Sequence, residues 1–189
     1  MMQLVFFLEG PSEEALLRGL LPRFLPDYVN LHYVVFEGKQ DLEKRLVKRM
    51  RGWCLPDTRF VVLRDKDAGD CVAIKKHLQV LCKKAGHDDA LVRIACHEIE
   101  SWYLGDLSAV EQGLDVTGIA KHQNKAKFRN PDRLANAAKE LVTITEGCYQ
   151  KMSGSRQIGP CLALMGNKSG SFNVFISGIQ HIISEMGQA

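Results

Sequence analysis

Short apolar segments alternate with amphipathic segments through the first two thirds of the chain. Four apolar runs, rich in β-branched and aromatic residues, predict buried strands over residues 4–8, 30–36, 59–64 and 91–96. Apolar residues recur at helical spacing between them and predict helices over residues 11–24, with a bend or stop at Pro22, and over 41–53, 71–84 and 99–104. This alternation predicts an α/β fold in which a mainly parallel, Rossmann-like sheet is flanked by helices.

The pattern changes after about residue 115, so we expect an α/β domain over residues 1–115 and a helical C-terminal extension over residues 116–189 packed on it. Residues 118–130 are polar and basic without a clear period, which predicts a linker or mobile loop. Helices are predicted over residues 131–145 and 171–186. Between them, the basic, small-residue segment 151–156 either cradles a phosphate or forms a turn between helices.

The composition sets limits on the class of protein. A length of 189 residues fits one compact domain with room for a small appendage, and a net charge of +3 is too small to establish nucleic-acid binding by itself. We see no signal peptide and no apolar run long enough to span a bilayer, which favours a cytoplasmic protein without a membrane partner. The six cysteines form no C-x-x-C pair, so neither a zinc site nor a disulfide framework is expected.

Carboxylates stand where two of the predicted strands end. Glu9 follows the first strand, and Asp65 and Asp67 follow the third. The carboxyl ends of parallel strands meet at one edge of a sheet, where α/β proteins bind their ligands. Residues two apart on a strand point the same way, so Asp65 and Asp67 are expected to share one site. Because these carboxylates repel one another, we expect a divalent cation, Mg²⁺ or Mn²⁺, between them.

Further carboxylates extend this predicted cluster. Glu13 lies about one helical turn beyond Glu9, and Glu98 and Glu100 follow the fourth strand. Two cations held close together could position a water molecule and stabilise the leaving oxygen of a phosphodiester. The alternative is that Glu13 belongs only to a good helix start and that Asp-x-Asp is a chance pair. The joint occurrence at successive strand ends favours the metal site.

The order of these motifs resembles the TOPRIM fold, which topoisomerases, bacterial primases and OLD-family nucleases share. The resemblance covers about residues 3–105, and Leu8-Glu9-Gly10-Pro11-Ser12-Glu13 is most similar to the OLD-type version. More narrowly, L-R-D-K-D-A-G-D-C at 63–71 and A-C-H-E-I-E-S-W-Y-L-G-D at 95–106 resemble an uncharacterised TOPRIM-like bacterial family. Members of that family are often encoded beside an AAA-type ATPase.

The resemblance implies roles for the acidic residues. Glu9 would be an acid/base or metal-bound group, and Asp65 and Asp67 would hold Mg²⁺. Glu13 and Glu100 are carried over from the OLD-like pattern as further metal ligands. OLD proteins contain their own ATPase domain, whereas this chain lacks a G-x-x-x-x-G-K-[ST] loop, so an AAA-type ATPase would be a separate partner.

A nuclease also needs positive charge near the phosphates of its substrate. Candidates at the scissile phosphate are Lys151 and Arg156. Candidates for nucleic-acid contact are Lys44, Lys48, Arg51, Lys125, Lys127 and Lys168. The alternative for the helix 41–53 is a solvated cationic face, and Lys168 also fits a loop before the last helix. Trp102 and Tyr103 are expected to anchor the sheet rather than to stack on bases.

The residues and the resemblance together predict a Mg²⁺- or Mn²⁺-dependent nuclease that cleaves DNA or RNA. The resemblance further implies a bacterial phage-defence system with a partner ATPase. Two alternatives stay open. One is a non-catalytic TOPRIM-like module that regulates the ATPase, and the other is a metal-dependent enzyme that acts on a small phosphorylated substrate. A homo-oligomer is compatible with the nuclease and with both alternatives.

Overall fold

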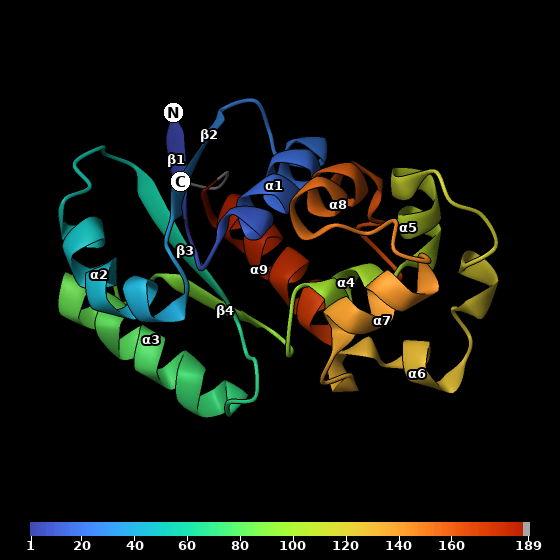
Figure 1. The fold of residues 1–189 in the computed structure, drawn as a ribbon. Helices are drawn as coiled ribbons and strands as arrows, with labels where there is room; N and C mark the ends of the chain where they lie inside the picture. The colour runs from blue at the N-terminus through green and yellow to red at the C-terminus, as the bar shows by residue number, and fades with distance from the viewer. Residues whose placement is uncertain (187–189) are drawn as a thin grey trace.

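The computed structural model describes residues 1–186 and contains a four-stranded, all-parallel sheet in the order β2-β1-β3-β4 (Figure 1). The strands are β1 (Met2–Leu8), β2 (Val29–Val35), β3 (Thr58–Asp65) and β4 (Leu91–Ala95). Each lies within two residues of the boundaries predicted from the apolar runs. The fold is therefore α/β with a parallel sheet flanked by helices, as the hydrophobic pattern predicted.

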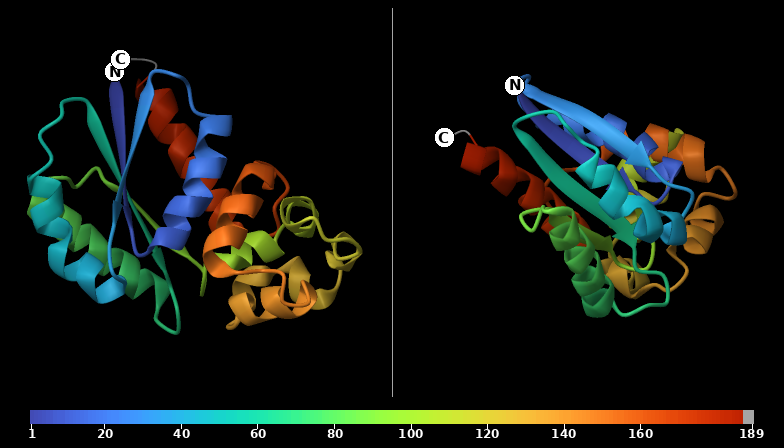
Figure 2. Two further views of the ribbon diagram at one scale, coloured as in Figure 1. Left: turned by 45° about the horizontal axis from the view of Figure 1, so that its top comes forward. Right: turned by 90° about the vertical axis from the view of Figure 1, so that its left-hand side faces the viewer.

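Helices cover both faces of this sheet (Figures 1 and 2). α1 (Pro11–Leu20) lies on one face, and α2 (Lys39–Arg51) and α3 (Cys71–Ala85) lie on the other. Successive residues of a strand point to opposite faces, so Phe6 packs in the core on the α1 side and Phe7 in the core beside α2 and α3. A strand buried on both sides reads as an unbroken apolar run, which is why the sequence pattern identified β1 and β3 so clearly. α1 gives way to a 3₁₀ turn, η1 (Leu21–Arg23), at the predicted proline.

The strand order creates a crevice at the carboxyl edge of the sheet. After β1 the chain turns to one face through α1, and after β3 it turns to the other face through α3. Such a reversal between neighbouring strands is the place where open α/β sheets bind ligands. Leu8 pairs with Leu63 across β1 and β3, so Glu9 and Asp65 stand at the mouth of this crevice.

The C-terminal part is helical and shares its core with the sheet. Its helices and 3₁₀ turns are α4 (Glu100–Leu104), α5 (Leu107–Leu114), η2 (Ala120–His122), α6 (Ala126–Arg129), η3 (Pro131–Arg133), α7 (Ala137–Ile144), α8 (Lys151–Ile158), η4 (Gly159–Cys161) and α9 (Gly170–Met186). α9 returns to the sheet beside β4 (Figure 2). One apolar core joins β1 residues to Phe172 and Phe175 of α9, and it includes the fully buried Trp102 and Tyr103, which do anchor the sheet.

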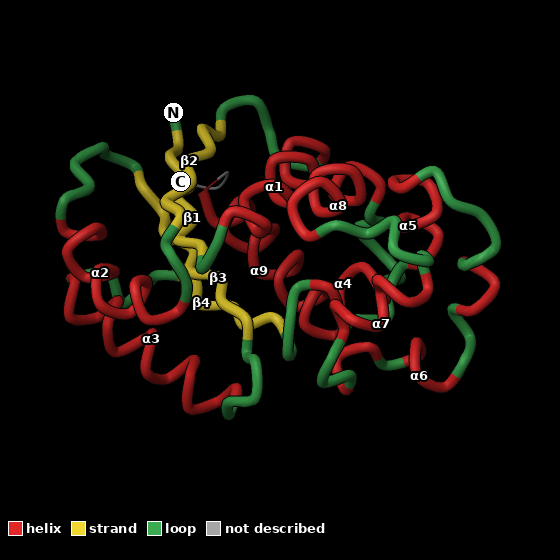
Figure 3. Tube along the Cα trace, in the orientation of Figure 1, coloured by secondary structure: helices red, strands yellow, loops and turns green. Residues whose placement is uncertain are grey.

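Three predicted segments differ in the structure. Residues 118–130 contain η2 and α6 rather than a plain loop, because Phe128 is buried in the main core. The predicted helix 131–145 is divided into η3 and α7 (Figure 3). Asp132 explains the division: its carboxylate accepts a hydrogen bond of 2.7 Å from the backbone N–H of Ser171 at the start of α9, which fixes η3 there. None of the helices among residues 1–186 is both long and apolar enough to cross a membrane.

Candidate functional site

Three buried carboxyl groups meet on the α1 side of the crevice, and we call them the inner carboxylate cluster. Asp65 comes from the end of β3, Glu13 from the first turn of α1 and Glu100 from the first turn of α4. Their exposed fractions are 5%, 2% and 0%. Asp65 points to this side because it continues the alternation of Val61 and Leu63, which belong to the same core. The cluster therefore depends on the register of β3 as much as on its sequence.

The electrostatics of the cluster show an excess of negative charge. Burial raises the pKa of Asp65 well above its usual value, and the charges of Glu13 and Glu100 raise it further. Burial likewise raises the pKa values of Glu13 and Glu100, with Lys151 opposing the shift in both. Burial lowers the pKa of Lys151, but its attraction to Glu100 and Asp65 outweighs this and the net shift is upward. Three carboxyl groups thus share one ammonium group.

Two oxygen atoms of the cluster lack a partner. Oε1 of Glu100 accepts a 2.9 Å hydrogen bond from the hydroxyl of Tyr149, whereas its Oε2 is buried without a hydrogen bond among the described residues. Oδ1 of Asp65 is likewise buried without a hydrogen bond among the described residues. An unsatisfied buried polar group costs about 1–3 kcal/mol, and more when charged. Hard oxygen donors with unpaired lone pairs are what a divalent cation prefers, so the types of residue suit the predicted metal.

Glu9 lies between the inner cluster and the opposite face of the sheet. Its Oε2 accepts a 3.3 Å hydrogen bond from the backbone N–H of Asp65 and lies 3.9 Å from Nε of Arg64. Glu9 is half-buried, and burial followed by the charge of Asp67 raises its pKa, with Arg64 opposing the shift. Glu9 therefore interacts electrostatically with both aspartates.

Asp67 does not share a site with Asp65 in the way that strand alternation predicted. β3 ends at Asp65, and Asp67 has a left-handed φ of 51°, so the alternation no longer applies there. Its carboxylate accepts a 2.6 Å hydrogen bond from Lys39 at the start of α2. The backbone holds this turn, since the N–H of Asp67 donates to the carbonyl of His97 at 2.8 Å. Glu98 already has a partner as well: its carboxylate accepts a 2.9 Å hydrogen bond from the N–H of Ala138.

The carboxylates lie near one another, but their oxygen atoms do not converge on one point as the ligands of a metal ion do. Among residues 1–186, no three His, Cys, Asp or Glu side chains form a group arranged to hold a metal ion. A cation at this edge would need rotation of side chains toward it. The residues that can do so line a hollow of about 400 Å³ at the crevice. Its lining includes Glu9, Gly10, Glu13, Asp65 and Lys151.

Lys151 reaches this hollow from a helix, not from a phosphate-binding loop or a turn. Residues 151–156 form most of α8, which corrects both interpretations of that segment. Its small residues serve packing: a Cβ on Gly154 would overlap the ring of Tyr149, and Ser155 accepts a 2.8 Å hydrogen bond from Tyr103. No sequence motif points to Tyr149, which the structure identifies by its hydrogen bond to Glu100 and its close contact with Gly154.

Arg156 stands apart from the carboxylates. It is exposed and lines a different hollow, together with Glu14 and Arg18 of α1. Of the two basic residues predicted at the scissile phosphate, the structure brings only Lys151 to the acidic site.

The other basic candidates do not form one surface. Lys44 and Lys48 are exposed on α2, and Arg51 donates a 2.6 Å hydrogen bond to the carbonyl of Lys84. Lys127 pairs with Glu140 at 2.6 Å. Figure 1 shows α2 and α6 at opposite ends of the molecule, with Lys125 and Lys127 at α6. Lys168 is exposed in the segment before α9. These residues therefore do not mark a single binding surface.

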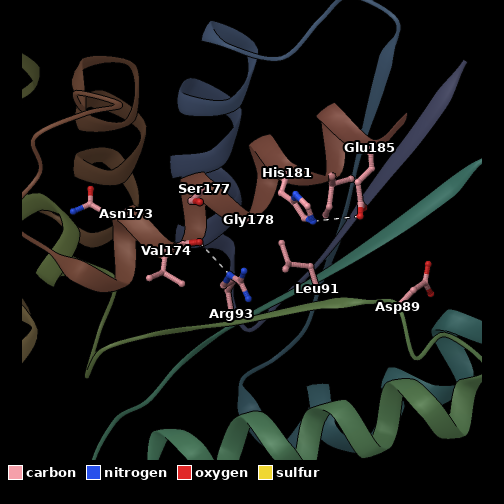
Figure 4. A pocket seen from close by; sticks show the side chains of 10 residues that line it. Asp89, Leu91, Arg93, Asn173, Val174, Ser177, Gly178, His181 and Glu185 are labelled. Atoms are coloured by element: carbon pink, nitrogen blue, oxygen red, sulfur yellow. Dashed lines mark hydrogen bonds and ion pairs between the residues drawn. The ribbon is translucent and has the colours of Figure 1, made fainter. Parts of the chain in front are cut away.

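A further hollow, of about 490 Å³, separates β4 from α9 (Figure 4). Its charged side chains already have partners: Nε of Arg93 donates to the carbonyl of Val174 at 3.2 Å, and His181 lies 3.3 Å from Glu185. The hollow lies away from the inner carboxylate cluster, and we assign no ligand to it.

Comparison with known proteins gives a family without an activity. A family model with the description "Domain of unknown function (DUF4276)" matches residues 8–180. The matched range includes Glu9, the inner carboxylate cluster and Lys151. No curated protein and no solved structure matches the chain.

Proposed function

Because the chain belongs to the DUF4276 family, whose description names no activity, we propose from the site itself that it is a Mg²⁺- or Mn²⁺-dependent nuclease. One observation carries this proposal. Asp65, Glu13 and Glu100 are buried together at the carboxyl edge of the sheet with a single lysine, and two of their oxygen atoms have no partner. A site that gathers so much unpaired negative charge favours a cation.

The residues take distinct roles in this proposal. Glu13 and Asp65 would hold the cation, since both line the hollow, and Glu100 would complete the negative field behind them. The bound cation would supply charge stabilisation of a phosphoryl oxygen and a polarised water molecule. Lys151 would stabilise the negative charge that develops on the phosphate.

Glu9 is the best candidate for a general base. It is half-buried at the mouth of the hollow, and burial and Asp67 bring its pKa closer to neutrality than that of an ordinary glutamate. A base near the working pH both accepts a proton and is available unprotonated. Asp67, already paired with Lys39, would order the rim of the site rather than bind the cation directly.

The resemblance of residues 8–13, 63–71 and 95–106 to TOPRIM and OLD-type sequences supports the choice of phosphodiester chemistry. The same resemblance supports an AAA-type ATPase partner and a role in phage defence, which belong to this proposal. A regulatory module without catalysis is the outcome to expect if no substrate is cleaved.

A second candidate function is cleavage of a small phosphorylated molecule. Two observations favour it. The hollow of about 400 Å³ has the size of a small-molecule pocket, and the basic side chains around it are scattered. The chemistry at the carboxylates would be the same, and only the substrate would differ.

The test is a cleavage assay on purified protein with plasmid, linear DNA, RNA and bis-p-nitrophenyl phosphate, each with Mg²⁺, Mn²⁺ or EDTA. We expect metal-dependent cleavage that Asp65→Asn abolishes. Asp88→Asn is the matched control, because Asp88 is exposed and lies outside the site. Cleavage of the small diester alone would select the second candidate. Equal behaviour of the wild type and Asp65→Asn on every substrate, with and without a neighbouring ATPase, would refute catalysis.

A further inference from the structure

A basic hollow of about 440 Å³ lies beside the edge strand β2, at the C-terminal end of α2. It is separate from the acidic crevice, with which it shares no lining residue. Its lining consists of Val34, Arg45, Lys48, Arg49, Gly52 and Trp53. The lining therefore contains three cations, an aromatic ring and no carboxylate.

The positive charge of this hollow is largely uncompensated. Arg45 lies 3.3 Å from Asp41, one helical turn earlier, with about half of its side chain exposed. Within residues 1–186, neither Lys48 nor Arg49 has a carboxylate within ion-pair distance, and both are exposed. Residues three and four apart are neighbours on a helix surface, so these cations project from one side of α2. An anionic ligand would meet several positive charges at once.

Trp53 gives the hollow a fixed aromatic wall. Its indole N–H donates a 3.2 Å hydrogen bond to the hydroxyl of Thr58, and the ring of His32 packs edge-on with centroids 5.0 Å apart. The indole is half-buried, and Gly52 beside it adds no side chain that would fill the space. The ring is thus held in one orientation at the boundary between core and hollow.

A cationic helix face is usually no more than a solvated surface. A solvated face, however, does not explain why its cations surround a hollow walled by an immobilised tryptophan. Bases stack on aromatic side chains, and lysine and arginine bind the phosphates that link them. We propose that this hollow binds one nucleotide unit of a single-stranded nucleic acid, with the base against Trp53 and the phosphates on Lys48 and Arg49.

The place of the hollow along α2 relates it to the acidic site. Lys39 begins α2 and pairs with Asp67 at the crevice, whereas Trp53 follows the other end of the helix. α2 has 13 residues, which corresponds to a length of about 20 Å. Lys44 is exposed along this length, so a bound strand has cationic support between the hollow and the crevice. Cleavage of a strand bound in this way rests on the proposed nuclease function. Binding of the strand in the hollow does not depend on that function.

The first test measures binding without catalysis. Fluorescence anisotropy with labelled single-stranded DNA and RNA oligonucleotides, in EDTA and low salt, gives the dissociation constant. We expect salt-sensitive binding that the double variant Lys48→Ala/Arg49→Ala weakens by about tenfold or more. Lys83→Ala/Lys84→Ala on α3 is the matched control: it removes the same charge from two exposed lysines outside the hollow and should change affinity by less than about twofold.

The second test identifies the aromatic contact. The chain has two tryptophans, and Trp102 is fully buried, so quenching of intrinsic fluorescence by an added oligonucleotide reports on Trp53. We expect quenching that saturates together with the anisotropy signal. Trp53→Phe keeps an aromatic ring and should bind nearly as well without quenching, whereas Trp53→Leu should bind roughly fivefold more weakly or worse. Circular dichroism of each variant confirms that it is folded.

The outcomes distinguish an oligonucleotide from a free nucleotide as the ligand. They also distinguish a failure of this inference from a failure of the proposed nuclease function. A mononucleotide that binds as tightly as the oligonucleotide, and quenches equally, would assign the hollow to a free nucleotide. Absence of oligonucleotide and mononucleotide binding, equal affinities of the two double variants, or the absence of quenching would overturn the inference. Loss of cleavage in Asp65→Asn with oligonucleotide binding retained would support the inference, because that substitution affects the crevice and leaves the basic hollow unchanged.

Discussion

The hydroxyl of Tyr149 donates a 2.9 Å hydrogen bond to Oε1 of Glu100, and both side chains are buried. The bond joins residues 49 positions apart, the first just before α8 and the second at the start of α4. It fixes one oxygen of the carboxyl group and leaves Oε2 buried without a partner. Tyr149 therefore positions Glu100 in the inner carboxylate cluster, although Tyr149 does not line the hollow.

Removing this hydroxyl should destabilise the protein. Tyr149→Phe leaves both oxygens of Glu100 without a donor in the core, which we expect to lower the free energy of unfolding by about 1–3 kcal/mol. Urea denaturation at neutral pH in EDTA measures the change. Tyr28→Phe is the control, because Tyr28 is exposed and should lose less than about 0.5 kcal/mol. Equal losses in the two variants would mean that the hydrogen bond contributes nothing specific.

Gly154→Ala tests why α8 contains a glycine. Alanine is favoured over glycine in a helix by about 1 kcal/mol, so the substitution would stabilise an unhindered helix. Here the new Cβ would overlap the ring of Tyr149, and we expect net destabilisation of about 1–3 kcal/mol in the same urea experiment.

A shortened partner should reverse this result. In a Tyr149→Leu background, Gly154→Ala should be neutral or stabilising, because the overlapping ring has been removed. Destabilisation of the same size in both backgrounds would show that the glycine is required for another reason.

The sequence was sufficient to predict the parts of the site that follow from periodicity. Apolar runs buried on both sides identified β1 and β3, and parallel strands bring their carboxyl ends to one edge. This is why Glu9 and Asp65 could be expected side by side, and their backbone-mediated contact of 3.3 Å agrees with that expectation. Glu13 and Glu100 join Asp65 because helices that begin directly after strands start at the same edge.

The remaining features depend on contacts that leave no local signal. The left-handed turn at Asp67 is held by the carbonyl of His97, which lies 30 residues further along the chain, so strand alternation could not predict where the Asp67 side chain lies. Gly154 and Ser155 look like loop residues until Tyr149 and Tyr103 are placed against them. In both places a distant part of the chain decides what a short motif does.

The pKa shifts predict how stability depends on pH. Burial raises the pKa of Asp65 well above 3.8 and that of Glu100 above 4.5 in the folded protein. Between the unfolded and folded pKa values, the folded state binds more protons than the unfolded state. Stability must then fall as pH rises through that window, by up to about 1.4 kcal/mol per pH unit for each carboxyl group.

Thermal or urea denaturation from pH 4 to 8 in EDTA measures this slope. We expect Asp65→Asn to flatten it, because the amide cannot ionise, and to be more stable than the wild type at pH 8. Asp88→Asn should follow the wild-type curve, since Asp88 is exposed on the surface. A wild-type stability that rises steadily over the whole range would contradict the raised pKa values.

Divalent cations should stabilise the protein, and the two aspartates should differ in their contribution. A ligand that binds only the folded state adds about 2.7 kcal/mol at a concentration one hundred times its dissociation constant. We expect Mn²⁺ to raise the melting temperature of the wild type and to have much less effect on Asp65→Asn, which has lost one of the carboxylates that line the hollow. Asp67→Asn should keep most of the gain, because Asp67 is paired with Lys39 and does not line the hollow. Calorimetric titration with Mn²⁺ provides the affinities directly. If Asp67→Asn lost binding while Asp65→Asn retained it, the cation would belong on the α2 side of the crevice with Glu9.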